Sequence, residues 1–240
     1  MLENSLLLNL PYGERKRLEP FLQPTPLEFR QTLLESGEPI PFVWFPHNAV
    51  TSTVVDTPDG ATIEVGLMGM EGMVGLSLLL NVLDSNTTVI VQVAGHATRM
   101  RADHFFKHVV QAGGELYRRL LRYTNAFMAM VAQTAACNSM HNVDQRLARW
   151  LLMTQDRVQR DDFPMTHEFL AFMLGVRRPS VSVAANALLL NGYIDYKHGH
   201  MKIKDREALE EAVCPCYILV KSLMQGVLTT DRISGSSDAV

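Results

Sequence analysis

The sequence predicts an α+β protein with an antiparallel β jelly roll in the first half, one long helix in the middle, and short helices with a β hairpin in the last third. Three observations carry this prediction. Residues 39–98 are rich in β-branched and aromatic residues interrupted by glycines, residues 115–142 contain neither proline nor glycine, and residues 166–204 alternate short apolar segments with turn residues. Short strands with close turns favour a jelly roll over a parallel sheet. We therefore expect domains at residues 1–113, 114–141 and 142–240.

The composition is ordinary for a soluble globular protein. The chain has 240 residues, a formal net charge of −3, 47% hydrophobic residues and 20% charged residues. Its longest apolar runs are too short to cross a bilayer, and its start lacks the basic region and cleavage site of a secretory signal. Three cysteines cannot build a disulfide framework. These features predict a cytoplasmic protein without a membrane partner.

The β region follows a segment of mixed character. Residues 11–34 contain four prolines among polar and apolar residues and are expected to form short helices and turns. Further on, Asp59-Gly60 stands between "TSTVV" and "TIEVGL", which is a strong signal for a β hairpin. The stretch "TTVIVQV" then alternates with the period of a strand.

Residues 114–141 are predicted to form a dimerisation helix. Its apolar residues are spaced 4, 3, 4, 3, 4, 3, which is the heptad repeat of a coiled-coil seam. A second apolar stripe runs beside the first, so the helix can bury one stripe against its own β domain and the other against a partner. A core helix within a single chain is the alternative. The predicted dimer interface consists of Leu116, Leu120, Tyr123, Phe127, Met130, Thr134 and Cys137.

Residues 166–192 have the features of two short helices joined by a tight turn. Thr166 is a favourable N-cap for "HEFLAFML", and Gly175 ends that helix. Pro179 stands in the first turn of the next helix, where proline is tolerated. A connection this short favours a helix-turn-helix over antiparallel packing. Ala171 and Val181 occupy the positions where the two helices would meet.

Two arginines at the start of the second helix point to DNA. Arg177 and Arg178 oppose the helix dipole, at a cost of roughly 0.3–1 kcal/mol. An arginine bonded to guanine N7 and O6 contributes roughly 1–3 kcal/mol of base discrimination, which outweighs that cost. The alternative is an ordinary helical hairpin with solvated arginines. The basic stretch "YIDYKHGHMKIKD" that follows is typical of a wing placed against phosphates. The predicted DNA-binding residues are Thr166, Arg177, Arg178, Ser180, Ser182, Asn186, Lys197 and His200.

Nearly the whole chain resembles the Crp/Fnr family of bacterial transcription regulators. The resemblance rests on "RLARWLLMTQDR", "FLAFMLGVRRPSVSVAANALLLNGYIDY" and "HGHMKIKDREALEEAVCPCY", and on "VWFPHNAVTSTVVDTPDGATIEVGLMGMEGMVGLSLLL" and "VQVAGHATRM", which are similar to the family's cyclic-nucleotide-binding-like barrel. It implies a homodimer that senses a signal in the barrel and binds double-stranded DNA at a near-palindromic operator, with RNA polymerase as a further partner. By position, Arg177, Arg178, Ser180 and Ser182 would contact bases. Val183 stands where the family often has a second long side chain.

The sensor departs from the family pattern. Cyclic-nucleotide binders of this fold carry a Gly-Glu pair and an arginine, because a buried phosphate needs a guanidinium or several amides. Leu76 stands where the glutamate would be, and no arginine occurs from Gly37 to Thr98. Iron–sulfur sensors need a cysteine cluster, and no cysteine precedes Cys137. We therefore expect neither cyclic AMP nor an iron–sulfur cluster. An unknown small-molecule effector, or haem on His47, His96 or Met68, stays open.

No arrangement of residues indicates catalysis or a metal. Neither a Ser-His-Asp set nor paired carboxylates stand out, so we predict no catalytic residues and no enzyme activity. Cys214-Pro215-Cys216 has C-x-C spacing and lacks a second pair, so its thiols are expected to be structural or incidental, and no metal ligands are predicted. The alternative function is a small-molecule- or metal-binding jelly roll of the cupin type, whose C-terminal helices mediate assembly.

Overall fold

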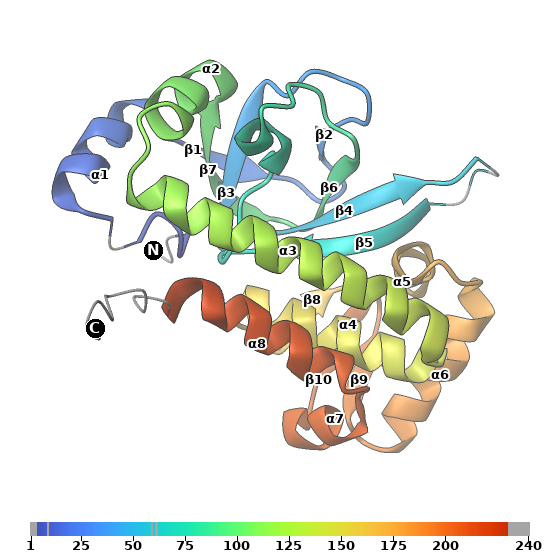
Figure 1. The fold of residues 1–240 in the computed structure, drawn as a ribbon. Coiled ribbons are helices and arrows are strands. Elements are labelled where there is room, and N and C mark those ends of the chain that lie inside the picture. Colours follow the sequence, from blue (N-terminus) through green and yellow to red (C-terminus); the bar gives the residue numbers. More distant parts are fainter. Residues whose placement is uncertain (1–3, 9, 59, 61, 230–240) are drawn as a thin grey trace, which may run out of the picture.

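The computed structural model describes residues 4–8, 10–58, 60 and 62–229 (Figure 1). The N-terminal domain contains α1 (Tyr12–Leu18), η1 (Glu19–Phe21), β1 (Gln23–Leu27), β2 (Thr32–Leu34), β3 (Phe42–Pro46), β4 (Val50–Asp56), β5 (Thr62–Met68), η2 (Leu76–Leu80), β6 (Thr88–Val93), β7 (Gly95–Arg101), α2 (Ala102–Phe105) and η3 (Phe106–Val110). The remainder contains α3 (Glu115–Met140), α4 (Val143–Val158), β8 (Asp162–Pro164), α5 (His167–Leu174), α6 (Arg178–Leu190), β9 (Ile194–Lys197), β10 (His200–Ile203), α7 (Arg206–Ala212) and α8 (Cys216–Thr229).

The first seven strands form two antiparallel sheets, in the orders β1-β7-β3 and β2-β6-β4-β5. Alternate residues of both sheets, among them Val43, Phe45, Val91 and Val93, are buried in one hydrophobic core. This arrangement confirms the predicted α+β class with an N-terminal jelly roll. The predicted hairpin is β4–β5, which pairs from Thr51 with Met68 to Asp56 with Thr62; Asp59 lies outside the described residues.

The expectation of helices and turns throughout residues 11–34 is wrong in its second half. Only α1 and η1 are helical there, while β1 pairs with β7 and β2 pairs with β6. The prolines Pro24 and Pro26 lie on β1, an edge strand of its sheet, where a residue without an N–H group costs little. Local composition therefore concealed two strands whose formation depends on partners far along the chain.

Helix α3 crosses the molecule between the β domain and α8 (Figure 1). It begins after Gly113-Gly114 and continues unbroken to Met140, as the absence of proline and glycine predicts. Asn142 then caps α4 by accepting a hydrogen bond from Gln145 N at 3.0 Å. No helix among the described residues is both long and apolar enough to span a membrane.

The stripe of α3 that we predicted to face a partner is buried within its own chain. Leu116, Leu120, Tyr123, Met130 and Cys137 are at most 1% exposed, Thr134 is 9% exposed, and Phe127 is partly buried against the core. They pack against β5, η2 and α8, so this stripe is not available to a partner helix. The stripe left at the surface has the same heptad spacing and consists of Arg118, Leu121, Asn125, Met128, Ala132, Ala135 and Ser139.

Candidate nucleic-acid interface

The C-terminal domain contains the predicted helix-turn-helix. Thr166 Oγ1 accepts a hydrogen bond from Phe169 N (3.2 Å) and caps α5, and Gly175 ends that helix at φ +61°, a conformation that favours glycine. The next helix, α6, begins at Arg178 with Pro179 in its first turn. Ala171 and Val181 are buried where the helices meet, as their spacing predicted.

The start and outer face of α6 are open to solvent. Arg177, Arg178 and Ser180 are exposed, and among the described residues no carboxylate forms an ion pair with either arginine. Val183 is 69% exposed, and Asn186 lies about one turn further along the same helix. Two guanidinium groups, a hydroxyl, an isopropyl group and an amide therefore occur within three turns of one exposed surface.

Ser182, in contrast, uses its hydroxyl inside the domain. Its Oγ donates to Arg178 O (3.3 Å) and lies 3.1 Å from Nδ1 of His167. The His167 ring stacks on Tyr196 with 4.3 Å between centroids, and burial together with the charge of Arg178 lowers the pKa of His167. Ser182 and His167 thus hold α6 against α5 and β9. No spacing in the sequence points to His167 or Tyr196, because both act through tertiary contacts.

The wing forms beside the start of α5. Strand β10 pairs with both β9 and β8, and Lys197 lies opposite His200. Met165 N donates to Gly199 O (2.7 Å), which places the wing turn next to Thr166. Lys197 and Thr166 are exposed. The His200 ring is already hydrogen-bonded to Asp162 (3.2 Å), so it is less available to a phosphate than the sequence predicted.

A buried chain of polar groups joins the β domain to α4. Trp150 Nε1 donates to Glu64 Oε1 (3.0 Å), and Ser52 Oγ lies 2.6 Å from Glu64 Oε2 and 2.6 Å from Gln92 Oε1. Gln92 Nε2 donates to Thr154 Oγ1 at 3.0 Å. Burial raises the pKa of Glu64 to about 8.

With the Gln92 amide in this orientation, the hydrogens of the network also favour a neutral Glu64. The Ser52 hydroxyl has one hydrogen and two neighbouring oxygens, so it can donate to only one of them. If Glu64 is protonated, its own O–H donates to Ser52, and Ser52 donates to Gln92. Each hydrogen bond of this network, which runs from Trp150 through Glu64, Ser52 and Gln92 to Thr154, then has one hydrogen. The junction between the β domain and α4 is therefore a neutral, fully bonded network.

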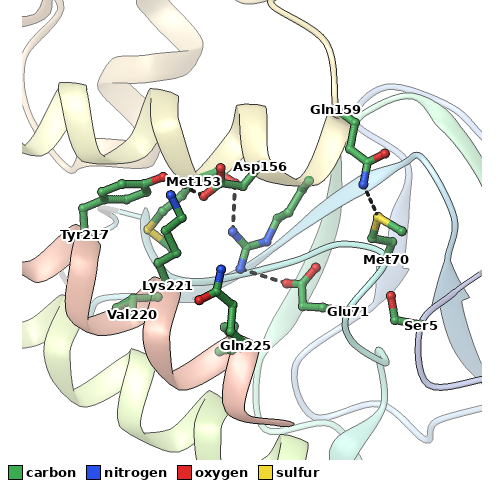
Figure 2. A pocket seen from close by; sticks show the side chains of 12 residues that line it. Ser5, Met70, Glu71, Met153, Asp156, Gln159, Tyr217, Val220, Lys221 and Gln225 are labelled. Carbon is green, nitrogen blue, oxygen red and sulfur yellow. Dashed lines mark hydrogen bonds and ion pairs between the residues drawn. The ribbon is translucent and has the colours of Figure 1, made fainter. Parts of the chain in front are cut away.

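Charged groups form a second junction, between the β domain, α4 and α8. Buried Arg157 forms an ion pair with Glu71 at 2.8 Å, and Asp156 accepts hydrogen bonds from Tyr217 Oη (3.0 Å) and Arg206 (2.6 Å). Figure 2 shows Glu71, Asp156 and Tyr217 around a cavity of about 360 Å³. The charged groups around this cavity are therefore already paired with one another or with neighbouring side chains.

A cavity of about 350 Å³ lies between the larger sheet, η2 and α3. Leu76 lines it, and none of the described residues around it is charged. Hydroxyl and amide groups come from Thr53, Ser77, Ser85, Asn86, Thr87 and Thr124. A cavity of this size holds a small ligand, and this one has no guanidinium group for a cyclic phosphate.

The three side chains left open for haem do not converge. Met68 lines the cavity next to α3, whereas His47 and His96 line a different cavity of about 590 Å³ beside the N-terminal segment. His47 Nε2 is also bonded to Thr98 Oγ1 (2.8 Å). This arrangement does not support a haem held by Met68 and a histidine.

Comparison with known proteins agrees with this geometry. Residues 145–212 match the family model of the Crp-like helix-turn-helix domain. FixK2 from Bradyrhizobium japonicum aligns with a TM-score of 0.68 at 13% identity, over 80% of this chain and 98% of FixK2. A CRP-family transcriptional regulator from Thermus thermophilus aligns with a TM-score of 0.63 at 21% identity, over 78% of this chain and 95% of the regulator. The c-di-GMP-responsive global regulator CLP from Xanthomonas campestris aligns with a TM-score of 0.60 at 14% identity, over 80% of this chain and 99% of CLP.

No curated protein sequence matches the chain. The matched segment contains both helices of the helix-turn-helix and the wing, whereas the structural matches cover 78–80% of the chain. The chain therefore contains a Crp-like helix-turn-helix domain, and its overall fold is that of transcription regulators of the Crp/Fnr family.

Proposed function

We propose that the chain binds a near-palindromic operator as a homodimer and contacts bases through the exposed start of α6. The observation that carries this proposal is the surface formed by Arg177, Arg178, Ser180 and Val183, whose two guanidinium groups have no carboxylate partner among the described residues. In a helix-turn-helix the first residues of the second helix enter the major groove. Thr166 and Lys197 lie beside that helix on α5 and the wing, where they contact phosphates.

Val183 gives the half-site a specific chemical preference. Its exposed isopropyl group cannot donate a hydrogen bond, but it can contact the C5 methyl group of thymine. Arg178, five positions earlier, suits a guanine. We therefore expect a half-site in which a guanine contacted by arginine is followed by a thymine near Val183.

The dimer forms through the exposed stripe of α3. Leu121 is 42% exposed and Met128 is 65% exposed, and both lie on the heptad positions left at the surface. The alanines Ala132 and Ala135 allow a second helix to approach closely, and a polar residue such as Asn125 at one seam position fixes register. Leu223 of α8 borders the same groove as Leu121, so α8 widens the contact surface.

Replacing Met128 by Glu is expected to prevent dimerisation. Two carboxylates would then face each other in an apolar seam, which costs several kcal/mol and weakens association about 100-fold or more. Sedimentation velocity over a concentration series measures this change. The control is Tyr12→Glu, because Tyr12 is 78% exposed on α1, away from the seam. A Met128→Glu protein that dimerises as tightly as the control would show that the partner binds elsewhere.

The cavity between the larger sheet, η2 and α3 is the proposed sensor site for an uncharged small molecule. Thr124, Phe127 and Val131 of α3 line it, so a ligand there touches the same helix that carries the dimer stripe. Half-sites lie about 34 Å apart on DNA, and a small rotation of α3 would change the separation of the two Arg178 side chains. Ligand binding would thereby alter operator affinity.

Selection of bound fragments from a random duplex-DNA pool tests this function. Wild-type protein is expected to enrich an inverted repeat, the Arg177→Ala/Arg178→Ala variant is expected to enrich none, and cyclic AMP is expected to leave the wild-type result unchanged. If wild-type protein enriched no sequence with or without cell extract, the chain would not be a sequence-specific reader. Enrichment that depended on cyclic AMP would contradict the proposed sensor.

A further inference from the structure

All three cysteines of the chain converge with one histidine at the end of α3. Cys137 and His141 are four residues apart, so they lie on one side of the last helical turn. Cys214 and Cys216 flank Pro215 at the junction of α7 and α8. The three sulfur atoms and a ring nitrogen of His141 all lie within 4.8 Å of one another, and the three cysteines are buried.

The spacing of these atoms matches that of ligands around a tetrahedral ion. Cys137 Sγ and Cys214 Sγ are 3.7 Å apart, and Cys216 Sγ and His141 Nδ1 are 3.6 Å apart. Zinc bonds of about 2.3 Å to sulfur and about 2.05 Å to nitrogen give tetrahedral edges of about 3.8 Å between sulfurs and about 3.6 Å between sulfur and nitrogen. A disulfide would need sulfurs about 2.05 Å apart.

The surroundings suit an anionic metal centre. Gln133 Nε2 donates to Cys216 Sγ (3.0 Å), a contact that orients a ligand sulfur. Arg146 and Arg149 are both close enough to interact with the charge of Cys137, and neither forms an ion pair with a carboxylate among the described residues. Three thiolates around one dication leave one net negative charge, which these guanidinium groups offset.

We propose that Cys137, His141, Cys214 and Cys216 bind one Zn²⁺ ion that fastens the α7–α8 junction to the end of α3. Four protein ligands leave no open position, which is the arrangement of a structural zinc site. The ion would lie next to Asn142, the cap of α4, where the long helix passes into the DNA-binding domain. It would therefore hold α8 on α3 and fix the angle between α3 and that domain.

This proposal replaces the expectation that the thiols are incidental. The sequence shows no second pair near the C-x-C pair, because the other two ligands come from the end of α3. His141, the nearer of those two, precedes Cys214 by 73 residues. Only the fold reveals the Cys-x3-His pair on α3 as its complement.

The test uses the full-length wild-type protein, purified without chelator from zinc-supplemented cells. Elemental analysis is expected to find about one zinc per chain, and X-ray absorption at the zinc edge is expected to show three sulfur neighbours at about 2.3 Å and one nitrogen at about 2.0 Å. The Cys214→Ser/Cys216→Ser variant is expected to lose at least about 10-fold in bound zinc, because the two remaining ligands cannot hold the ion alone. His104→Gln is the matched control, because His104 lies on α2, outside the cluster.

The wild-type measurements decide the proposal even if the double variant does not fold. The proposal would be overturned if wild-type protein were purified free of zinc and bound none when the ion was restored. Its three thiols would have to be titratable in that experiment. A bound iron–sulfur chromophore or a Cys137–Cys214 disulfide would also overturn the proposal. A first shell without sulfur, or zinc retained in full by a folded Cys214→Ser/Cys216→Ser variant, would place the metal elsewhere.

Discussion

Arg178→Ala is expected to weaken binding to the selected operator by about 5-fold to 150-fold and to remove the preference for guanine at one position of each half-site. This range corresponds to the roughly 1–3 kcal/mol that a bidentate arginine–guanine contact contributes. Arg178 is exposed at the first position of α6, and no carboxylate of the described chain competes for it. Fluorescence anisotropy with the operator and with a scrambled duplex gives both affinities.

Lys197→Ala is the matched control, because it removes the same charge from the wing. A phosphate contact carries no sequence information, so this variant is expected to bind operator and scrambled DNA more weakly by the same factor. The slope of the logarithm of its binding constant against the logarithm of the salt concentration is expected to fall in magnitude by about one. Our assignment of Arg178 as a base-contacting residue is incorrect if the two variants behave alike.

Glu64→Gln is expected to stabilise the protein at neutral and alkaline pH and to remove a pH dependence of its unfolding. Glu64 is 6% exposed, and burial raises its pKa to about 8 from an ordinary value of 4.5. Between these two values the unfolded chain has lost the proton while the folded chain still binds it. The wild-type free energy of unfolding therefore falls as pH rises across this window and stops falling above about pH 8.

Glutamine reproduces the neutral form of Glu64 without titrating. Its amide oxygen can accept from Trp150, and its amide nitrogen can donate to Ser52, as the protonated carboxyl does. Each pKa unit corresponds to about 1.4 kcal/mol, so the stabilisation is expected to reach several kcal/mol near pH 8 and to vanish near pH 4.5. Urea unfolding at a series of pH values measures it.

The exposed Glu35 provides the control for this experiment. Glu35→Gln removes one carboxylate without touching the network, so its unfolding should follow the wild-type pH dependence. A Glu64→Gln protein with that same dependence would mean that Glu64 is ionised in the folded state, and that Ser52 donates to it instead of to Gln92.

The helix-turn-helix was predictable because its determinants are local. Thr166 caps one helix, Gly175 adopts the left-handed conformation that ends it, and Pro179 begins the next. The wing follows from a short basic hairpin around Gly199 in the same way. Each of these features depends on neighbours within a few residues, where residue type restricts backbone conformation directly.

The sequence by itself determined the order of β domain, long helix and winged domain, and it indicated that α3 carries one heptad stripe with a second apolar stripe beside it. Only the tertiary structure decided which face of α3 is buried, because spacing does not specify the neighbour of each face and the choice depends on what β5, η2 and α8 present to the helix. The same holds for the four metal ligands and for the Glu64 network. Trp150 and Glu64 are 86 residues apart, and His141 and Cys214 are 73 residues apart. The chemistry of both groups arises from proximity and burial, which no local sequence pattern records.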